Sequence, residues 1–234
     1  VVGPDYALSP EAAFPQAMEE CAAVVRWVAQ SGAEWGLDPA RIVIGGDSAG
    51  ANLAMGVALL LRETDPGLKL AGLLLNYGVF DSRLDTETYR AFAEGYFLTR
   101  EKMRFYWECY APRPADRLNP LAAPLRADLA GLPPVLLHIA ELDVLAAENR
   151  AMAAALRAAG VAVEASCARS DMSAPPAARW RRAAPGCGGW EGSRPPHPAS
   201  PGDVEDEVAG GERGGDVQHG DGGADPRRVE PHHG

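Results

Sequence analysis

Hydrophobic residues over the first 172 positions follow two patterns that alternate along the chain. Short apolar runs bounded by Gly or Pro predict buried strands at 41–45, 70–75, 135–139 and 161–165. Apolar residues at helical spacing predict helices at 15–30, 51–62, 100–110 and 146–159, with Gly160 placed to cap the last one. The chain also opens, at Val1, in what resembles a strand. This alternation predicts an α/β domain with a mainly parallel sheet and helices on both faces.

The composition changes abruptly near Met172. Residues 173–234 contain no Leu, Ile, Phe, Tyr or Met, and they include nine Pro and thirteen Gly. Such a segment cannot bury enough apolar surface to offset the entropy of ordering it. We therefore divide the chain into an α/β part, 1–172, and a disordered tail, 173–234. Out-of-frame reading of GC-rich coding DNA would give this composition, and a natural disordered tail is the alternative.

Charge and cysteine content narrow the class of protein. The formal net charge of -10 argues against a nucleic-acid partner. The four cysteines are widely spaced and form neither a metal nor a redox motif, so we expect no metal and no cofactor. Reduced thiols, with no signal peptide and no apolar run long enough to span a membrane, favour a cytoplasmic protein. The oligomeric state is not encoded in any pattern we recognise.

The pentapeptide Gly46-Asp47-Ser48-Ala49-Gly50 carries the clearest chemistry. It follows a predicted buried strand and opens a predicted helix. A serine on such a sharp turn needs a strained backbone, and glycines two residues away let the chain segments approach each other. The turn lifts the Ser48 hydroxyl above the sheet edge, and the backbone N–H of Ala49 can then stabilise a developing oxyanion. The pattern indicates an activated serine nucleophile.

The chain resembles the GDSAG-containing hormone-sensitive lipase family of esterases, which are α/β-hydrolases. Besides residues 44–54 around Ser48, three stretches match family motifs in the family's order. They are the D-Y-x-L-x-P-E and F-P segments at 5–17, N-P-L with G-L-P-P at 119–134, and E-L-D-V-L-A-A-E at 141–148. The resemblance implies an α/β-hydrolase fold, and we expect this chain to be incomplete at both ends of that fold.

The resemblance also implies roles for individual residues. Ser48 matches the family's nucleophile, and Asp143 matches the acid that orients a catalytic histidine. Glu148 matches a second acidic position, for which we favour a hydrogen-bonding or helix-face role. Structural support is the role we favour for Glu11 and Asp47. Two departures from the family pattern, Val144 and Ala147, are expected to loosen the loop that carries Asp143.

A general base is not evident. The family's histidine would fall near residue 173, where the sequence has none. His138 lies in an apolar strand, where a core role is favoured, and His197, His219, His232 and His233 lie in the tail. The family's H-G-G-G oxyanion loop would precede Val1. Because a free serine hydroxyl is a poor nucleophile, we expect near-zero activity from this polypeptide.

Three functional hypotheses therefore remain open. The leading one is a serine carboxylic-ester hydrolase acting on a small-molecule ester through an acyl-enzyme. In that case the aromatic residues of 100–110 either line an acyl pocket or pack in the core, and we favour the core. The second hypothesis is a non-catalytic binding protein that uses the same pocket. The third is a gene fragment without function.

Overall fold

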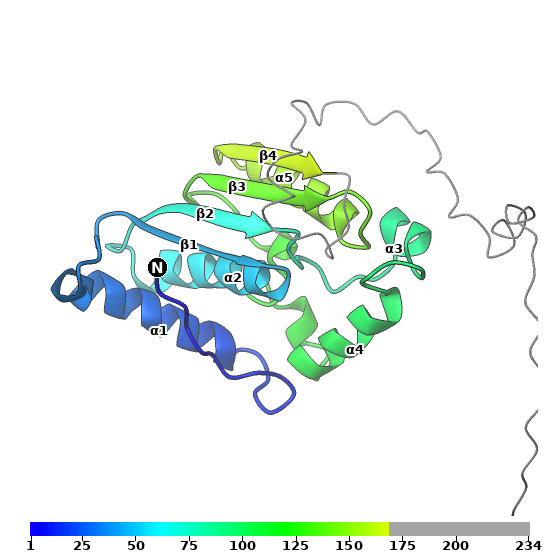
Figure 1. Ribbon diagram of the computed structural model, residues 1–234, viewed down its shortest axis with the longest axis horizontal. Helices are drawn as coiled ribbons and strands as arrows, with labels where there is room; N and C mark the ends of the chain where they lie inside the picture. The colour runs from blue at the N-terminus through cyan, green and yellow to red at the C-terminus, as the bar shows by residue number, and fades with distance from the viewer. Residues whose placement is uncertain (169–234) are drawn as a thin grey trace, which may run out of the picture. The chain divides into compact units, whose positions relative to one another are not determined.

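The computed structural model of the protein describes residues 1–168, and its centre is a four-stranded parallel sheet (Figure 1). The strands lie in the order β1-β2-β3-β4, and every neighbouring pair is parallel. Their bounds are Ile42–Asp47 for β1, Leu70–Asn76 for β2, Val135–Ala140 for β3 and Val163–Ala168 for β4. All four predicted strands are confirmed, and each observed strand ends one to three residues beyond the predicted end.

Four of the helices match the predicted ones closely. Their bounds are Gln16–Ser31 for α1, Ala49–Thr64 for α2, Arg100–Tyr110 for α4 and Ala146–Ala158 for α5. Gly160 adopts a φ of 78°, as a C-terminal capping glycine does, and its N–H donates to the carbonyl of Arg157. A further short helix, α3 (Glu87–Ala91), was not predicted because five residues carry little periodicity. It begins at Thr86, whose hydroxyl accepts a hydrogen bond from the N–H of Tyr89.

The core lies between the sheet and the helices that follow β1 and β3. Alternate strand residues point toward α2 and α5, and they form one apolar cluster with those helices; on the strands these are Leu73, Leu75, Val135, Leu137 and Ile139. On the other face, the Val43 side chain is 59% exposed, and no described helix covers it. The predicted parallel sheet with helices is confirmed. Both long helices that pack on the central strands share one face.

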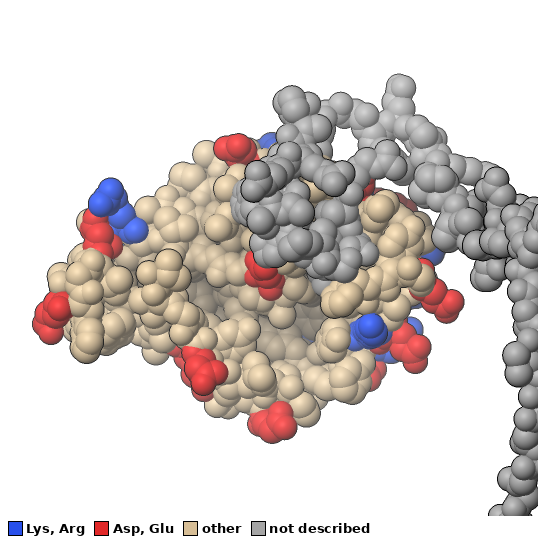
Figure 2. Space-filling view, viewed as in Figure 1, with Lys and Arg blue, Asp and Glu red and all other residues tan. Residues whose placement is uncertain are grey.

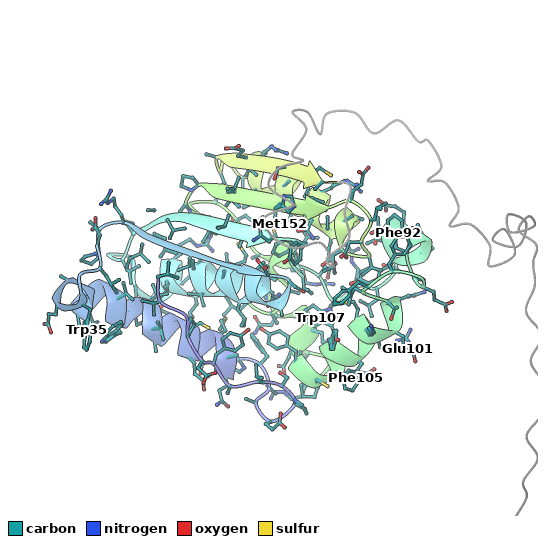
Figure 3. The ribbon with its side chains drawn as sticks, in the orientation of Figure 1. Trp35, Phe92, Glu101, Phe105, Trp107 and Met152 are labelled. Carbon is teal, nitrogen blue, oxygen red and sulfur yellow. The ribbon has the colours of Figure 1, made fainter. Side chains whose placement is uncertain are left out.

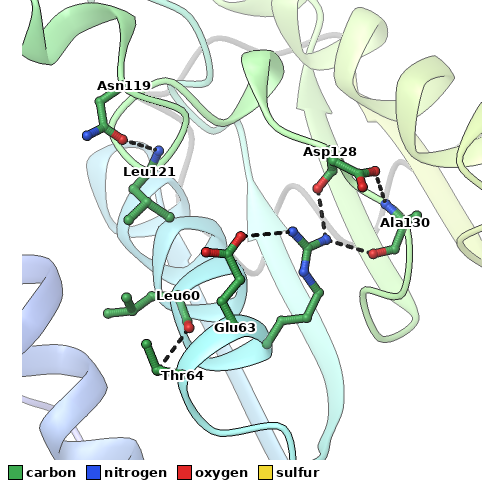
Figure 4. Close-up of polar contacts among 8 residues, drawn as sticks. Leu60, Glu63, Thr64, Asn119, Leu121, Asp128 and Ala130 are labelled. Atoms are coloured by element: carbon green, nitrogen blue, oxygen red, sulfur yellow. Dashed lines mark hydrogen bonds and ion pairs between the residues drawn. The ribbon is translucent and has the colours of Figure 1, made fainter.

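The end of α2 is tied to the loop that leads into β3. One guanidinium nitrogen of Arg62, Nη1, donates to the carbonyl oxygens of Asp128 and Ala130 at 2.8 and 2.7 Å (Figure 4). The Asp128 carboxylate in turn accepts from the Ala130 N–H, which closes the turn. This contact fixes the far end of the helix that begins at Ser48, so that the helix axis is set at both ends.

The segment around Val1 departs from its prediction. Residues 1–8 form no strand. Among the described residues, β1 forms strand hydrogen bonds only with β2, and residues 1–8 do not pair with its other edge. The outer edge of β1 is thus a free edge of the described sheet. Within this part of the chain, no helix is long and apolar enough to cross a membrane. The tail 173–234, with its predicted disorder, lies outside the described residues.

Candidate active site

Ser48 occupies the turn between β1 and α2 in a strained conformation. Its φ is 54° and its ψ is -115°, a region that residues with a side chain rarely adopt. Three backbone hydrogen bonds hold it there. The Ser48 N–H donates to the carbonyl of Asn76 at 2.9 Å, and its own carbonyl accepts from the N–H groups of Ala51 and Asn52. The predicted sharp strand-to-helix turn is therefore present at the predicted serine.

The two glycines of the motif are not equivalent. A Cβ built on Gly46 would lie 2.5 Å from the carbonyl carbon of Gly50, so this position admits no side chain. A Cβ on Gly50 would meet no described atom within 4 Å. The close approach that the sequence predicted is real, but only Gly46 is required for it. Gly45, one residue earlier, is needed as well, because its Cβ would lie 2.5 Å from the carbonyl oxygen of Leu74.

The turn is held from its two sides by polar side chains. The Asp47 carboxylate accepts from the Asn76 side-chain amide at 2.7 Å and from the Tyr77 hydroxyl at 2.6 Å. Buried Asn52, in the first turn of α2, donates to the carbonyls of Val79 and Ala122, both at 2.7 Å. These contacts support the structural role that we favoured for Asp47. Glu11, by contrast, is exposed and forms no hydrogen bond to another described residue.

Ser48 and Ala49 border an apolar hollow of about 580 Å³. Its other walls come from residues 6–10, from Asn52 and Leu53, from Val79, and from α4 with the residues before it. On α4, Trp107 is buried and lines the hollow from the core side, whereas Phe105 lines it from an exposed position (Figure 3). The face of the molecule shown in Figure 2 is largely uncharged, with scattered acidic groups and a few basic ones. All four aromatic residues of α4 thus line the hollow, and Trp107 also packs in the core.

Asp143 follows β3 in the turn that leads into α5. Because β1 and β3 are parallel with only β2 between them, their carboxyl ends, and so Ser48 and Asp143, lie at the same edge of the sheet. The Asp143 side chain is 3% exposed, and its Oδ1 accepts from the N–H of Leu145 at 2.8 Å. A buried carboxylate at this edge suits the orienting role that the family resemblance implies.

The loop that carries Asp143 is anchored rather than loosened at its two departures from the family pattern. The hydroxyl of Thr88, in α3, donates to the carbonyl of Val144 at 2.7 Å. The same oxygen accepts from the N–H of Ala147 at 3.2 Å. Thr88 is itself buried, so its bond to the Val144 carbonyl is shielded from water. These two bonds restrain the backbone of the loop at both positions.

His138 occupies the core position that the sequence indicated. It lies within β3, is 2% exposed, and its Nδ1 is 2.9 Å from the hydroxyl of Ser166 on β4. It is the only histidine among the described residues, since the other four lie beyond residue 168. No hydrogen bond joins the Ser48 hydroxyl to another described side chain. The described residues therefore supply a serine and a carboxylate at one edge, without an imidazole between them.

Comparison with known proteins places this arrangement in a family. A family model described as the α/β-hydrolase fold matches residues 1–172. The chain belongs to the α/β-hydrolase family. Carboxylesterase NlhH of Mycobacterium tuberculosis is 36% identical to this α/β-hydrolase chain over 168 residues, which are 70% of the chain and 52% of that relative.

Solved structures of esterases give the same picture. A thermostable esterase from Pseudomonas putida is 40% identical, with a TM-score of 0.68, over 70% of this chain and 52% of its own. A fungal esterase from Rhizomucor miehei has the same identity, coverage and TM-score. The thermophilic carboxylesterase EstE1, cloned from a metagenomic library, is 38% identical, with a TM-score of 0.67, over 70% of this chain and 56% of its own. The chain spans about half the length of the relatives it matches.

Three residues that position the site were missed from the sequence. They are Asn52, Thr88 and Asn149, and all three are buried polar side chains that bond to backbone groups of other segments. Asn52 and Asn149 sit within or directly after quoted motifs, so a polar residue at a core-facing helix position was a usable signal. Thr88 gave no signal, because its partners lie more than fifty residues away.

Proposed function

We propose that this chain carries the nucleophile and the acid of a serine carboxylic-ester hydrolase. Ser48 is the nucleophile, the backbone N–H of Ala49 donates to the oxyanion, and Asp143 is the acid that orients the base. The observation that carries the proposal is the strained turn at Ser48, whose cost persists only where the surrounding structure imposes it. The relatives named carboxylesterase and esterase support an ester as the substrate.

The proposed reaction is acyl transfer in two steps. The Ser48 oxygen attacks the ester carbonyl carbon, its proton passes to a base, and the alcohol leaves as the acyl-enzyme forms. Water then attacks the acyl-enzyme and releases the carboxylic acid and the serine. In both steps the negative charge develops on the carbonyl oxygen, near the N–H of Ala49 at the positive end of α2. Asp143 acts through the base and not on the substrate.

The hollow beside Ser48 fits the apolar part of an uncharged ester. Its walls are mostly aliphatic and aromatic, and the one charged side chain among the described lining residues, Lys102, donates its Nζ to the carbonyl of Phe97. An ester with an aliphatic or aromatic group would bury that group here at about 25 cal/mol per Å². A charged group would lose its hydration without gaining a partner. We therefore propose small, uncharged, apolar esters as the substrate class.

We further propose that this polypeptide turns over slowly. His138 is buried and its Nδ1 faces Ser166, so it does not serve as the base for Ser48. The histidines at 197, 219, 232 and 233 lie outside the described residues, and we assign none of them. Removing a triad member leaves a residual rate that comes from the oxyanion donors and binding. Acylation by an ester with a good leaving group is the step that this residual machinery supports best.

The test is a burst experiment with p-nitrophenyl butyrate on the full chain. We expect release of one equivalent of p-nitrophenolate per chain, followed by slow turnover. Ser48→Ala abolishes the burst, whereas the matched control Ser31→Ala, at the end of α1, retains it. A folded chain without a burst, which nevertheless binds a non-hydrolysable ester analogue in the hollow, would instead be a binding protein. A burst that survives Ser48→Ala would remove Ser48 as the nucleophile.

A further inference from the structure

Glu148 is a carboxyl group buried beneath the site and not used by the proposed reaction. It lies in the first turn of α5 and is 2% exposed. Its Oε1 accepts from the N–H of Phe80 at 2.9 Å, and the N–H of Asp81 also points at this carboxyl. Its second oxygen, Oε2, is buried and has no hydrogen-bond partner among the described residues. The carboxyl therefore holds backbone of the segment that follows β2.

The neighbouring residue holds the same segment. The Asn149 side chain accepts from the N–H of Gly78 at 2.9 Å and donates to the carbonyl of Gly78 at 2.8 Å. A Cβ at Gly78 would lie 2.2 Å from the ring of Phe80, so this backbone is also tightly packed. Two adjacent residues of α5 thus make three hydrogen bonds to residues 78–80. We name this set of contacts the α5 clamp.

The clamped segment touches both halves of the site. On one side, the carbonyl of Val79 accepts from Asn52, and the hydroxyl of Tyr77 donates to Asp47 in the nucleophile turn. On the other side, Glu148 and Asn149 lie five and six residues after Asp143, in the helix α5 that follows the Asp143 turn. Val79 also borders the hollow beside Ser48. The α5 clamp therefore connects the Asp143 loop to the Ser48 turn through side-chain contacts, in addition to the ladder of β1, β2 and β3.

We propose that Glu148 is a positioning residue: its buried carboxyl joins the start of α5 to residues 78–81 and so fixes Asp143 relative to Ser48. This proposal rests on the proposed function, since it assigns Glu148 a task in the placement of that nucleophile and that acid. Glu148 does not touch the substrate, and it acts only through the two segments that it joins.

The charges around Glu148 determine the form in which it works. Burial raises the pKa of this carboxyl well above its ordinary value, and the nearby carboxylates of Asp81 and Asp143 raise it further. Asp81 is paired with Arg83 and Arg126 at 2.6 and 2.9 Å, so its charge is balanced, and that of Glu148 is not. The remaining facing group, the hydroxyl of Tyr89 on α3, is neutral because burial raises its pKa as well. Burial and the neighbouring carboxylates thus both favour the neutral form of Glu148.

A pH dependence with a definite sign follows. The pKa of Glu148 is raised in the folded state, so its contribution to stability is complete below the unfolded-state pKa near 4.5. That contribution is lost as the pH rises through the folded-state pKa, when the Glu148 carboxylate forms beside those of Asp81 and Asp143. The clamp therefore weakens as the pH rises through the folded-state pKa of Glu148. A glutamine at this position keeps the acceptor for the Phe80 N–H and cannot ionise.

The experiment compares the full chain, Glu148→Gln and the exposed-site control Glu101→Gln from about pH 6 to about pH 9. The first readout is amide hydrogen exchange, corrected for the intrinsic pH effect, at Phe80 and, as a remote reference, at Asp65. The second is the burst rate with p-nitrophenyl butyrate. Because one pKa unit corresponds to a tenfold change in equilibrium, we expect the ratio of the Glu148→Gln rate to the wild-type rate to rise by at least about threefold.

The outcomes separate the two proposals. Two results together support the clamp. Phe80 loses protection as the pH rises in the wild type and in Glu101→Gln but not in Glu148→Gln, and the ratio of the Glu148→Gln burst rate to the wild-type burst rate rises over the same pH range. Phe80 protection that shows the same pH profile in all three proteins overturns it. So does a rate ratio that stays flat while protection changes, since Glu148 would then be structural only. Absence of any burst overturns the proposed nucleophile, and the exchange profile still decides whether the clamp exists.

Discussion

The two glycines of the nucleophile turn should respond in opposite directions to the same substitution. In Gly46→Ala the new methyl group would lie 2.5, 2.7 and 2.9 Å from the carbonyl carbon, carbonyl oxygen and Cα of Gly50. Favourable contacts between carbon atoms occur at about 3.5–4.0 Å, so the two backbone segments must move apart by about 1 Å. In Gly50→Ala the methyl group meets no described atom within 4 Å and lies in the first turn of α2.

The magnitudes follow from these distances. Overpacking in a well-packed region costs about 1–3 kcal/mol, and Gly46→Ala belongs at the upper end because the obstructing atoms are backbone that no rotamer change can move. Alanine in place of glycine in a helix stabilises by about 0.5–1 kcal/mol, which is the expected gain for Gly50→Ala. The two variants should therefore differ by about 3–4 kcal/mol in the free energy of unfolding.

The assay is urea unfolding of both variants and the wild type, followed by tryptophan fluorescence and far-UV circular dichroism. Trp27 and Trp107 report from α1 and α4, on either side of the turn. If Gly46→Ala unfolds within 0.5 kcal/mol of the wild type, the close approach of Gly46 and Gly50 does not exist in solution. Equal destabilisation by both substitutions would mean that the asymmetry between the two glycines is wrong.

Three further predictions concern strain and buried polar groups. Ser48→Gly should raise the free energy of unfolding by about 1 kcal/mol while Ser48→Ala does not, because only glycine relieves a φ of 54°; urea unfolding of both decides it. Thr88→Val should cost about 1–3 kcal/mol, since the carbonyl of Val144 and the N–H of Ala147 lose their buried partner; an unchanged unfolding midpoint would contradict this. Asn52→Ala should cost a similar amount and slow the p-nitrophenyl butyrate burst, and an unaffected burst would show that the contact with Val79 does not position the site.

The strands and most helices were predictable because their signals are local. The apolar runs at 70–75 and 135–139 are short, bounded by turn residues and rich in branched side chains, which fits only buried parallel strands. The serine turn was predictable for the same reason, since strand, pentapeptide and helix are contiguous in the sequence. The placement of helices on one face only was not, because periodicity shows which side of a helix is buried and not which side of the sheet it packs on.

The contacts that hold the site depend on residues far apart in the sequence. Thr88 and Val144 are separated by 56 residues, and Glu148 and Phe80 by 68. No local pattern links such pairs. From the sequence we expected a loose loop around Asp143, whereas the structure shows that the Thr88 hydroxyl holds this loop at Val144. For Glu148, the sequence indicated a hydrogen-bonding or helix-face residue. The structure shows the hydrogen bonds and places the side chain in the core instead of at the surface.

The most direct test of the central claim, that the turn presents Ser48 as an activated nucleophile, is fluorophosphonate labelling of the full chain with the modified peptide identified by mass spectrometry. The account predicts slow phosphonylation confined to the peptide that contains Ser48, abolished by Ser48→Ala and by unfolding in urea. A chain that is folded by circular dichroism yet carries no label at Ser48, or carries it equally on other serines, would contradict the account.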